Sequence, residues 1–188
     1  MKKENHRPVV LVVGGFDGSS GAGVSADLRM VDRIGGYGVA ALTALTVQDH
    51  RHFDRAVAVD AAMVGRQVSW LLQQYKVRCV KVGMLARADI ATAVADALQD
   101  SLPLPMVIDP LLRATSGGSL LDEAGFRVLC DRLIPMASLI TPNLEEASIL
   151  VGKEPGIPME ELAEALVEQF KVACLLKGGH SGRPKPGM

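Results

Sequence analysis

The first strongly patterned stretch of the sequence reads VVLVVGGFDGSSGAGVSADL over residues 9–28. Its opening run, Val9–Val13, is continuously apolar and rich in β-branched residues, as expected of a strand buried on both faces of a parallel sheet. A glycine-rich turn follows, and the next apolar residues recur at positions i, i+4 and i+7, as Val24, Leu28 and Val31. That spacing places them on one face of a helix. The stretch therefore predicts a strand, a loop and a helix in succession.

The same alternation continues along the rest of the chain. Further strands are predicted at 39–47, 57–59, 79–82, 106–109, 139–141 and 173–177. Further helices are predicted at 60–75, 88–98, 122–133, 144–151 and 159–170, with Asp60 and Asp122 as caps of two of them. Strands that alternate with helices predict an α/β fold whose central, mostly parallel sheet carries helices on both faces. No repeat or composition break marks a boundary, so residues 1–188 are expected to form a single domain, with 181–188 as a loop or tail.

Composition and charge narrow the possible partners. The 188 residues are 48% hydrophobic and 22% charged, which is typical of a globular domain with one sizeable core. With 20 basic and 21 acidic residues, the chain has no excess of positive charge for nucleic acid or an anionic membrane. Its apolar runs are too short to span a bilayer, and residues 1–8 lack the apolar stretch of a signal peptide. We expect a cytoplasmic location.

Cysteine and histidine usage gives little support for a zinc site. The three cysteines, Cys79, Cys130 and Cys174, cannot all pair, and none belongs to a CxxC motif. Since each has apolar neighbours, we expect them to fill space in the core. The close pair His50 and His52 lies in a polar loop without cysteine or an obvious third ligand, so zinc binding is improbable.

The glycine-rich loop after the first strand has several interpretations. It could be an ordinary turn between strand and helix, or a dinucleotide-binding fingerprint, because Gly21–Ala26 formally fits GxGxxG/A. The fingerprint, however, needs a tight turn directly after the strand and an acidic residue about twenty positions later. Here several residues separate the strand from Gly21, and the positions near Thr43 are apolar or hydroxylic. A Walker A loop is also absent, since no Gly-Lys-Ser/Thr follows a glycine-rich stretch.

The segment GGFDGSSGAGVSADL, residues 14–28, resembles the N-terminal signature of hydroxymethylpyrimidine and phosphomethylpyrimidine kinases. Later segments resemble the same family in the same order and at similar spacing, namely Thr43–Gln48, Lys81–Met84, Val107–Pro110, Thr141–Glu146 and Leu176–His180. The resemblance implies a ribokinase-like three-layer fold. It also implies ATP-dependent phosphorylation of 4-amino-5-hydroxymethyl-2-methylpyrimidine or its monophosphate in thiamin biosynthesis, with ATP as co-substrate, Mg²⁺ as cofactor and a homodimer as a possible assembly.

The resemblance assigns substrate binding to Gly15, Asp27, Gln48 and Met84. Gln48 offers one carbonyl acceptor and two amide donors, the complement of an aminopyrimidine edge, although a lone glutamine is more often a surface residue. By resemblance, Gln48 recognises the pyrimidine, Asp27 holds the hydroxymethyl group and Met84 packs on the ring.

A second group of residues is implied for phosphate and metal. Asp109 ends an apolar strand, where a carboxylate either caps the following turn or belongs to a phosphate and magnesium site. Asn143 and Glu146 match the Asn-x-x-Glu pattern that organises magnesium in ribokinase-like enzymes. Glu145 and Glu146 could otherwise form a solvated helix face.

Lys177 ends the last predicted strand, and Gly178 and Gly179 follow it. The ammonium group of Lys177 could meet nucleotide phosphates while the two glycines allow close approach of the backbone. The alternative is a lysine that extends from a strand end into solvent. The resemblance favours nucleotide binding.

The resemblance fails at the C-terminal end. Ribokinase-like kinases carry a Gly-Thr-Gly-Cys or Gly-Ala-Gly-Asp type of loop that forms an anion hole and supplies the catalytic base, and no such loop follows His180. The catalytic residue is therefore unknown, and the family's base is expected beyond Met188. We expect a truncated kinase, with a naturally short, non-catalytic pyrimidine-binding relative as the alternative. A pyridoxal-type kinase and, from the glycine pattern alone, a nicotinamide-dependent oxidoreductase are the other hypotheses.

Overall fold

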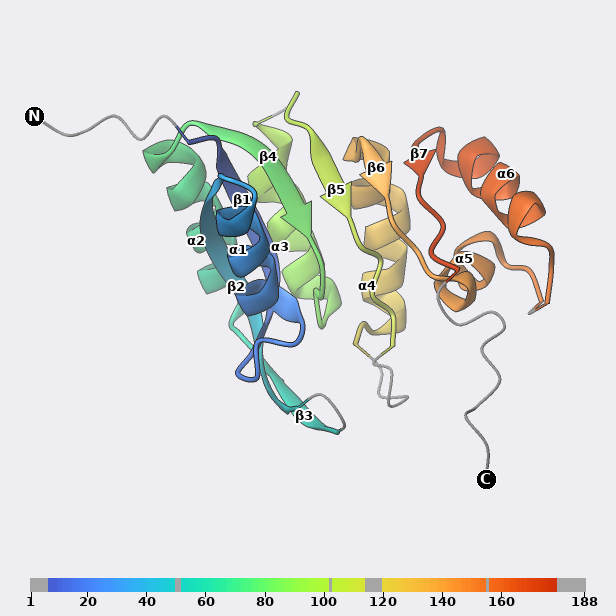
Figure 1. Cartoon of the computed structure of the whole chain (residues 1–188), viewed down its shortest axis with the longest axis horizontal. Helices are drawn as coiled ribbons and strands as arrows, with labels where there is room; N and C mark the ends of the chain where they lie inside the picture. Colours follow the sequence, from blue (N-terminus) through green and yellow to red (C-terminus); the bar gives the residue numbers. More distant parts are fainter. Residues whose placement is uncertain (1–6, 50–51, 102, 114–119, 155, 179–188) are drawn as a thin grey trace, which may run out of the picture.

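The computed structural model describes residues 7–49, 52–101, 103–113, 120–154 and 156–178, and its centre is a seven-stranded sheet (Figure 1). The strands in chain order are β1 (Val9–Asp17), β2 (Tyr37–Gln48), β3 (Phe53–Ala58), β4 (Val77–Val82), β5 (Met106–Ile108), β6 (Leu139–Ile140) and β7 (Ala173–Cys174). Their spatial order is β3-β2-β1-β4-β5-β6-β7. All neighbouring pairs are parallel except β2 and β3. The predicted mostly parallel sheet is confirmed.

The edge strand β3 is the element that differs most from its prediction. It begins at Phe53 and pairs antiparallel with β2, whereas only residues 57–59 were predicted as a strand. The polar residues Asp54 and Arg55 interrupt the apolar pattern, and Val57 is 61% exposed. Because an edge strand packs little of its surface against a core, its sequence carries a weak strand signal.

Helices cover both faces of the sheet, as predicted. Figure 1 shows α1 (Gly23–Arg33) on the near face, with α3 and α4 on the far face. The other helical segments are α2 (Ala61–Gln74), α3 (Ala88–Gln99), α4 (Glu123–Val128), η1 (Leu129–Leu133), η2 (Ile134–Met136), α5 (Leu144–Val151) and α6 (Met159–Phe170). The helix predicted at 122–133 thus divides into an α-helical turn and a π-helical segment.

The core lies on both sides of β1, which explains its unbroken apolar run. Leu11 belongs to the main cluster, to which α2 contributes Val64 and α3 contributes Ile90. Val12 points to the other face and packs against Val24 of α1. Burying each such side chain contributes roughly 1.5–3 kcal/mol relative to leaving it exposed. The sheet is therefore held from both faces at the strand that precedes the glycine-rich loop.

The two predicted aspartate caps are present. The side chain of Asp60 accepts a hydrogen bond from the backbone N–H of Met63 at 3.0 Å, and that of Asp122 accepts one from Gly125 at 2.6 Å. Each bond satisfies a backbone donor that the first helical turn leaves unpaired.

The three cysteines are free thiols and partly buried. Cys130 and Cys174 pack against the main core, as predicted. Burial raises the pKa of the Cys130 thiol to about 11, so this thiol stays protonated near neutral pH.

Among the helices of the described residues, none is both long and apolar enough to cross a membrane.

Candidate active site

A cavity of about 380 Å³ opens at the carboxyl ends of β1, β2, β4 and β5. Ligands of open parallel α/β sheets bind in this position. The cavity lining includes all four residues predicted to bind substrate, Gly15, Asp27, Gln48 and Met84. Asp109, predicted at the phosphate and metal site, also lines it. The structure therefore brings together residues that four separate sequence segments contribute.

Gly15 and Met84 lie directly against each other in this cavity. A Cβ atom at Gly15 would lie 2.8 Å from the Sδ atom of Met84, closer than real Cβ atoms approach a neighbour. The absence of a side chain on β1 therefore allows the Met84 side chain to form the adjoining wall. A larger residue at this position would displace the Met84 side chain from its place in the wall.

Asp17, which was given no role in the sequence analysis, organises the glycine-rich loop. Its buried carboxylate accepts hydrogen bonds from the backbone and hydroxyl of Ser19, both at 2.8 Å, and from the backbone of Ala22 at 2.9 Å. Burial alone would raise the pKa of Asp17, but the hydrogen bonds from Ser19, Ala22 and Gly21 lower it below its ordinary value. The carboxylate therefore fixes the loop in its charged form.

The start of α1 requires glycine at position 23. Gly23 has φ +60°, and a Cβ atom there would overlap the carbonyl oxygen of Gly15.

β1 runs to Asp17, so Gly21 stands four residues beyond the strand end. The tight turn of the dinucleotide-binding fingerprint is absent from this loop, which counts against the oxidoreductase hypothesis.

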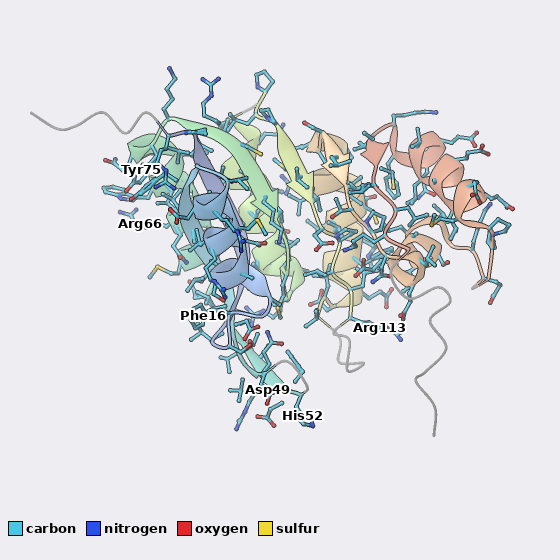
Figure 2. All side chains as sticks on the ribbon, viewed as in Figure 1. Phe16, Asp49, His52, Arg66, Tyr75 and Arg113 are labelled. Carbon is cyan, nitrogen blue, oxygen red and sulfur yellow. The ribbon has the colours of Figure 1, made fainter. Side chains whose placement is uncertain are left out.

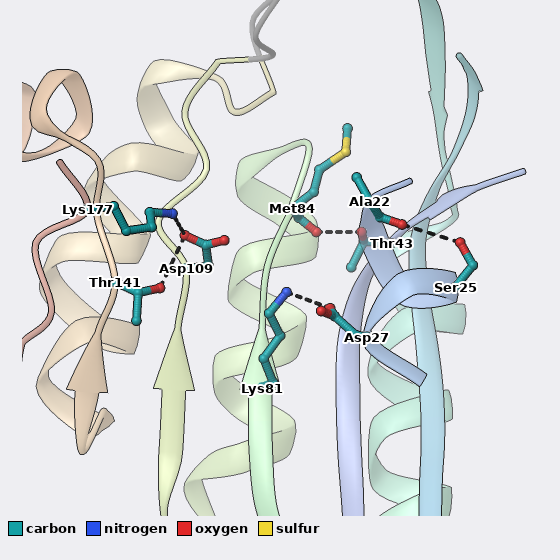
Figure 3. A network of polar contacts seen from close by, with 9 residues as sticks. All are labelled: Ala22, Ser25, Asp27, Thr43, Lys81, Met84, Asp109, Thr141 and Lys177. Atoms are coloured by element: carbon teal, nitrogen blue, oxygen red, sulfur yellow. Dashed lines mark hydrogen bonds and ion pairs between the residues drawn. The ribbon is translucent and has the colours of Figure 1, made fainter. Parts of the chain in front are cut away.

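Lys81 is the second residue of the site that the sequence analysis left without a role. Its Nζ atom lies 2.5 Å from Oδ2 of Asp27, and both side chains line the cavity (Figure 3). The signal was available, because Lys81 stands inside a strand whose neighbours Val80 and Val82 are fully buried. A lysine in such a strand needs a partner, since an unpaired buried charge is costly.

Asp109 and Lys177 also form an ion pair, in which Nζ lies 2.7 Å from Oδ1 (Figure 3). The hydroxyl of Thr141 donates to the same carboxylate oxygen at 3.2 Å. A residue predicted at the phosphate and metal site thus contacts one predicted at the nucleotide site. Lys177 does not simply extend into solvent, because its charge is paired with Asp109.

Asn143 and Glu146 form a reciprocal cap at the start of α5. Oδ1 of Asn143 accepts from the Glu146 backbone, and Oε2 of Glu146 accepts from the Asn143 backbone, both at 2.8 Å. Glu146 is only 3% exposed, which excludes a solvated helix face for this residue, whereas the Glu145 side chain is 66% exposed. The pKa of Glu146 is raised, mainly because the carboxyl is buried. The hydrogen bond from Asn143 and the charge of Lys177 lower this pKa, but by less than burial raises it.

The rim of the site is polar. Arg113 lines the cavity, lies 3.7 Å from the exposed carboxylate of Glu145, and is labelled in Figure 2. His52 lies 3.6 Å from Asp49, and Figure 2 shows both at the tip of the β2–β3 hairpin.

Three predictions, for His50, Gly179 and the tail at 181–188, concern positions outside the described residues. Within the described ranges, no group of three or more His, Cys, Asp or Glu side chains could hold a metal ion.

Comparison with known proteins places the chain among kinases. Residues 17–186 match the phosphomethylpyrimidine kinase family. The hydroxymethylpyrimidine/phosphomethylpyrimidine kinases of Rhizobium meliloti and Escherichia coli are each 35% identical, over 92% and 90% of this chain respectively. The alignment covers 65% of the length of either relative.

Solved structures agree with this assignment. Phosphomethylpyrimidine kinase from Clostridium difficile superposes with a TM-score of 0.83 and 30% identity, over 94% of this chain and 78% of that one. An ADP complex of Bacillus subtilis pyridoxal kinase superposes with a TM-score of 0.80 and 27% identity, over 93% of this chain and 66% of that one. From the family match and the shared fold, we conclude that the chain belongs to the phosphomethylpyrimidine kinase family.

Proposed function

We propose that the protein transfers the γ-phosphoryl group of ATP to 4-amino-5-hydroxymethyl-2-methylpyrimidine or its monophosphate, a step of thiamin biosynthesis. The observation that carries this proposal is the convergence of Gly15, Asp27, Gln48 and Met84 on one cavity at the strand ends. The names of the related Rhizobium meliloti and Escherichia coli kinases support the same reaction.

The cavity offers a suitable group for each part of the pyrimidine. The Gln48 amide carries a carbonyl acceptor and two N–H donors for the aminopyrimidine edge. Met84 and Gly15 provide an apolar wall and a bare backbone against which a flat ring can stack. The Asp27 carboxylate accepts a hydrogen bond from the substrate hydroxyl, and Lys81 orients that carboxylate.

ATP and Mg²⁺ are assigned to the neighbouring group of charges. Asp109 directly follows β5, Lys177 lies three residues after β7, and Glu146 belongs to α5, so two carboxylates and one ammonium group lie near one another. This set fits Mg²⁺, which typically takes one or two carboxylates and completes its coordination with water and substrate phosphates. When bound, the metal would neutralise charge on the phosphates, while Lys177 acts as a point charge for them. Solved Staphylococcus aureus pyridoxal kinases with AMP-PCP and with ADP support a nucleotide site in this fold.

A pyridoxal-type kinase is the second candidate, because several of the similar structures are pyridoxal kinases, one of them with pyridoxal bound. The non-catalytic pyrimidine-binding relative is the third. A cytoplasmic location and a homodimer stay predictions.

The experiment that separates these candidates measures ATP-dependent product formation with hydroxymethylpyrimidine and with pyridoxal in parallel. We expect a higher kcat/KM for the pyrimidine. A large preference for pyridoxal would overturn the substrate assignment. Saturable pyrimidine binding without turnover would support the non-catalytic alternative.

A further inference from the structure

The pairing between β1 and β2 contains one irregularity, and it lies at the cavity. Gly14 pairs with Leu42 and the next residue, Gly15, pairs with Ala44, so Thr43 is an extra residue in β2. Such a bulge changes the direction in which the following side chains point, and bulges are frequent beside active sites.

This bulge moves the later residues of β2 to the other face of the sheet. Residues two positions apart in a regular strand share a face. Leu42 packs against the cluster around Val12 and Val24 of α1, whereas Ala44 packs against Met84 and Leu120. The residues that follow Ala44 at every second position stay on its face of the sheet. Two of them, Thr46 and Gln48, line the cavity beside Met84. Without the extra residue, Gln48 would share the face of Leu42.

The side chain of Thr43 ties the bulge to the opposite wall of the cavity. Thr43 is fully buried, and its hydroxyl donates to the carbonyl oxygen of Met84 at 2.6 Å (Figure 3). The bond crosses β1, which lies between β2 and β4 in the sheet. The backbone beside the bulge is also held, because the Leu42 N–H donates to the side chain of Gln67 at 3.1 Å. One hydroxyl therefore connects the strand that carries Gln48 to the loop that carries Met84.

We propose that Thr43 is a positioning residue that sets the spacing between Gln48 and Met84 and thereby the selectivity of the cavity for a pyrimidine ring. Thr43 is not among the residues that line the cavity, so it acts through these two neighbours. This inference rests on the proposed function, because it names the part of the structure that shapes the same substrate site.

The test compares substitutions that remove the hydroxyl group with one that keeps it. Thr43→Val keeps the shape but leaves the buried carbonyl of Met84 without its donor, and Thr43→Ser keeps the donor. Thr43→Ser and Thr43→Ala form a second pair that differs by one oxygen and decides the question if Thr43→Val does not fold. Ser148→Ala is the matched control, because the hydroxyl of the buried Ser148 donates to Leu144 within α5, apart from the cavity.

Calorimetric titration with hydroxymethylpyrimidine gives the affinity, and thermal unfolding gives the stability. We expect Thr43→Val and Thr43→Ala to weaken pyrimidine binding by about 10- to 100-fold, the scale of a small misplacement of binding groups. Thr43→Ser and Ser148→Ala should stay within about 3-fold of the parent, even where Ser148→Ala loses as much thermal stability as Thr43→Val. The methyl resonance of Met84, identified by its loss in Met84→Leu, should shift in Thr43→Val and Thr43→Ala but not in Ser148→Ala.

The outcomes separate this inference from the proposed function. If the parent chain binds no pyrimidine, the proposed function fails irrespective of Thr43. If the parent binds the pyrimidine and the hydroxyl-free variants bind it equally well, Thr43 does not position the site. Equal losses in the Thr43 variants and in Ser148→Ala would likewise reduce Thr43 to a contributor to stability.

Discussion

The Nζ atom of Lys81 lies 2.5 Å from Oδ2 of Asp27, which joins β4 to α1 at the wall of the cavity. The two side chains are 25% and 29% exposed, so the pair is partly shielded from water. A charge-assisted hydrogen bond in such a setting is short and orients the carboxylate. The carboxylate assigned to the substrate hydroxyl is therefore already held in place before substrate binds.

Lys81→Met should weaken pyrimidine binding because Asp27 then loses its orienting partner. A double-mutant cycle with Asp27→Asn, measured by calorimetric titration, is expected to give a coupling energy of roughly 1–3 kcal/mol. Lys171→Met, a change on the surface after α6, is the control for loss of one positive charge. Additive effects of the two substitutions would mean that the ion pair has no part in binding.

Gln48→Ala should weaken pyrimidine binding by roughly 1–3 kcal/mol, because the polar edge of the ring would be desolvated without a partner. The affinity for ATP should barely change. Gln73→Ala, at an exposed position of α2, is the matched control and should leave both affinities unchanged. Equal losses for pyrimidine and ATP in Gln48→Ala would indicate a folding defect or a wrong assignment of this residue.

Asp17 should make the stability of the protein depend on pH. Its pKa is lowered from the ordinary value of 3.8. The free energy of unfolding that the charged carboxylate contributes is therefore complete above that value and is lost as the pH falls through the folded-state pKa. The difference in unfolding temperature between the parent and Asp17→Asn should therefore shrink below about pH 4. Asp100→Asn, at an exposed position, should show no comparable change. A difference that stays constant down to pH 2 would argue against the hydrogen-bonded carboxylate as the cause.

Glu146→Gln should raise the magnesium concentration needed for nucleotide binding or turnover. The substitution keeps a side-chain oxygen for the Asn143 backbone and removes only the charge. Glu145→Gln changes the charge of the exposed neighbour and provides the comparison. An unchanged magnesium dependence in Glu146→Gln, or an equal change in both variants, would remove Glu146 from the metal site.

Much of the fold could be predicted from the sequence because periodicity reports burial. The apolar run at Val9–Val13 and the helical spacing that follows it predicted the start of β1 and the helix α1. β1 continues to Asp17, however, through glycines that were predicted to form a turn. The bounds predicted for α5 and α6 are those observed. β3 was predicted too short, because an exposed edge strand is not required to be apolar.

The site was predictable only in part. The four substrate residues came from resemblance, and the structure places them around one cavity. The role of Lys81 depends on a partner brought close by folding, since Lys81 and Asp27 are 54 positions apart in the chain. The partners of Asp17, in contrast, lie within five positions of it in the same loop. The bulge at Thr43 was also invisible, because β2 is apolar on both faces around it and shows no alternation that an extra residue would visibly interrupt.

Calorimetric titration of the 188-residue chain with hydroxymethylpyrimidine, with pyridoxal titrated in parallel, shows whether this cavity binds the pyrimidine. The account predicts saturable binding of one pyrimidine per chain, weakened in Gln48→Ala, and weaker binding of pyridoxal. The absence of saturable pyrimidine binding by the folded chain, or an affinity that Gln48→Ala does not change, would contradict the assignment of this cavity.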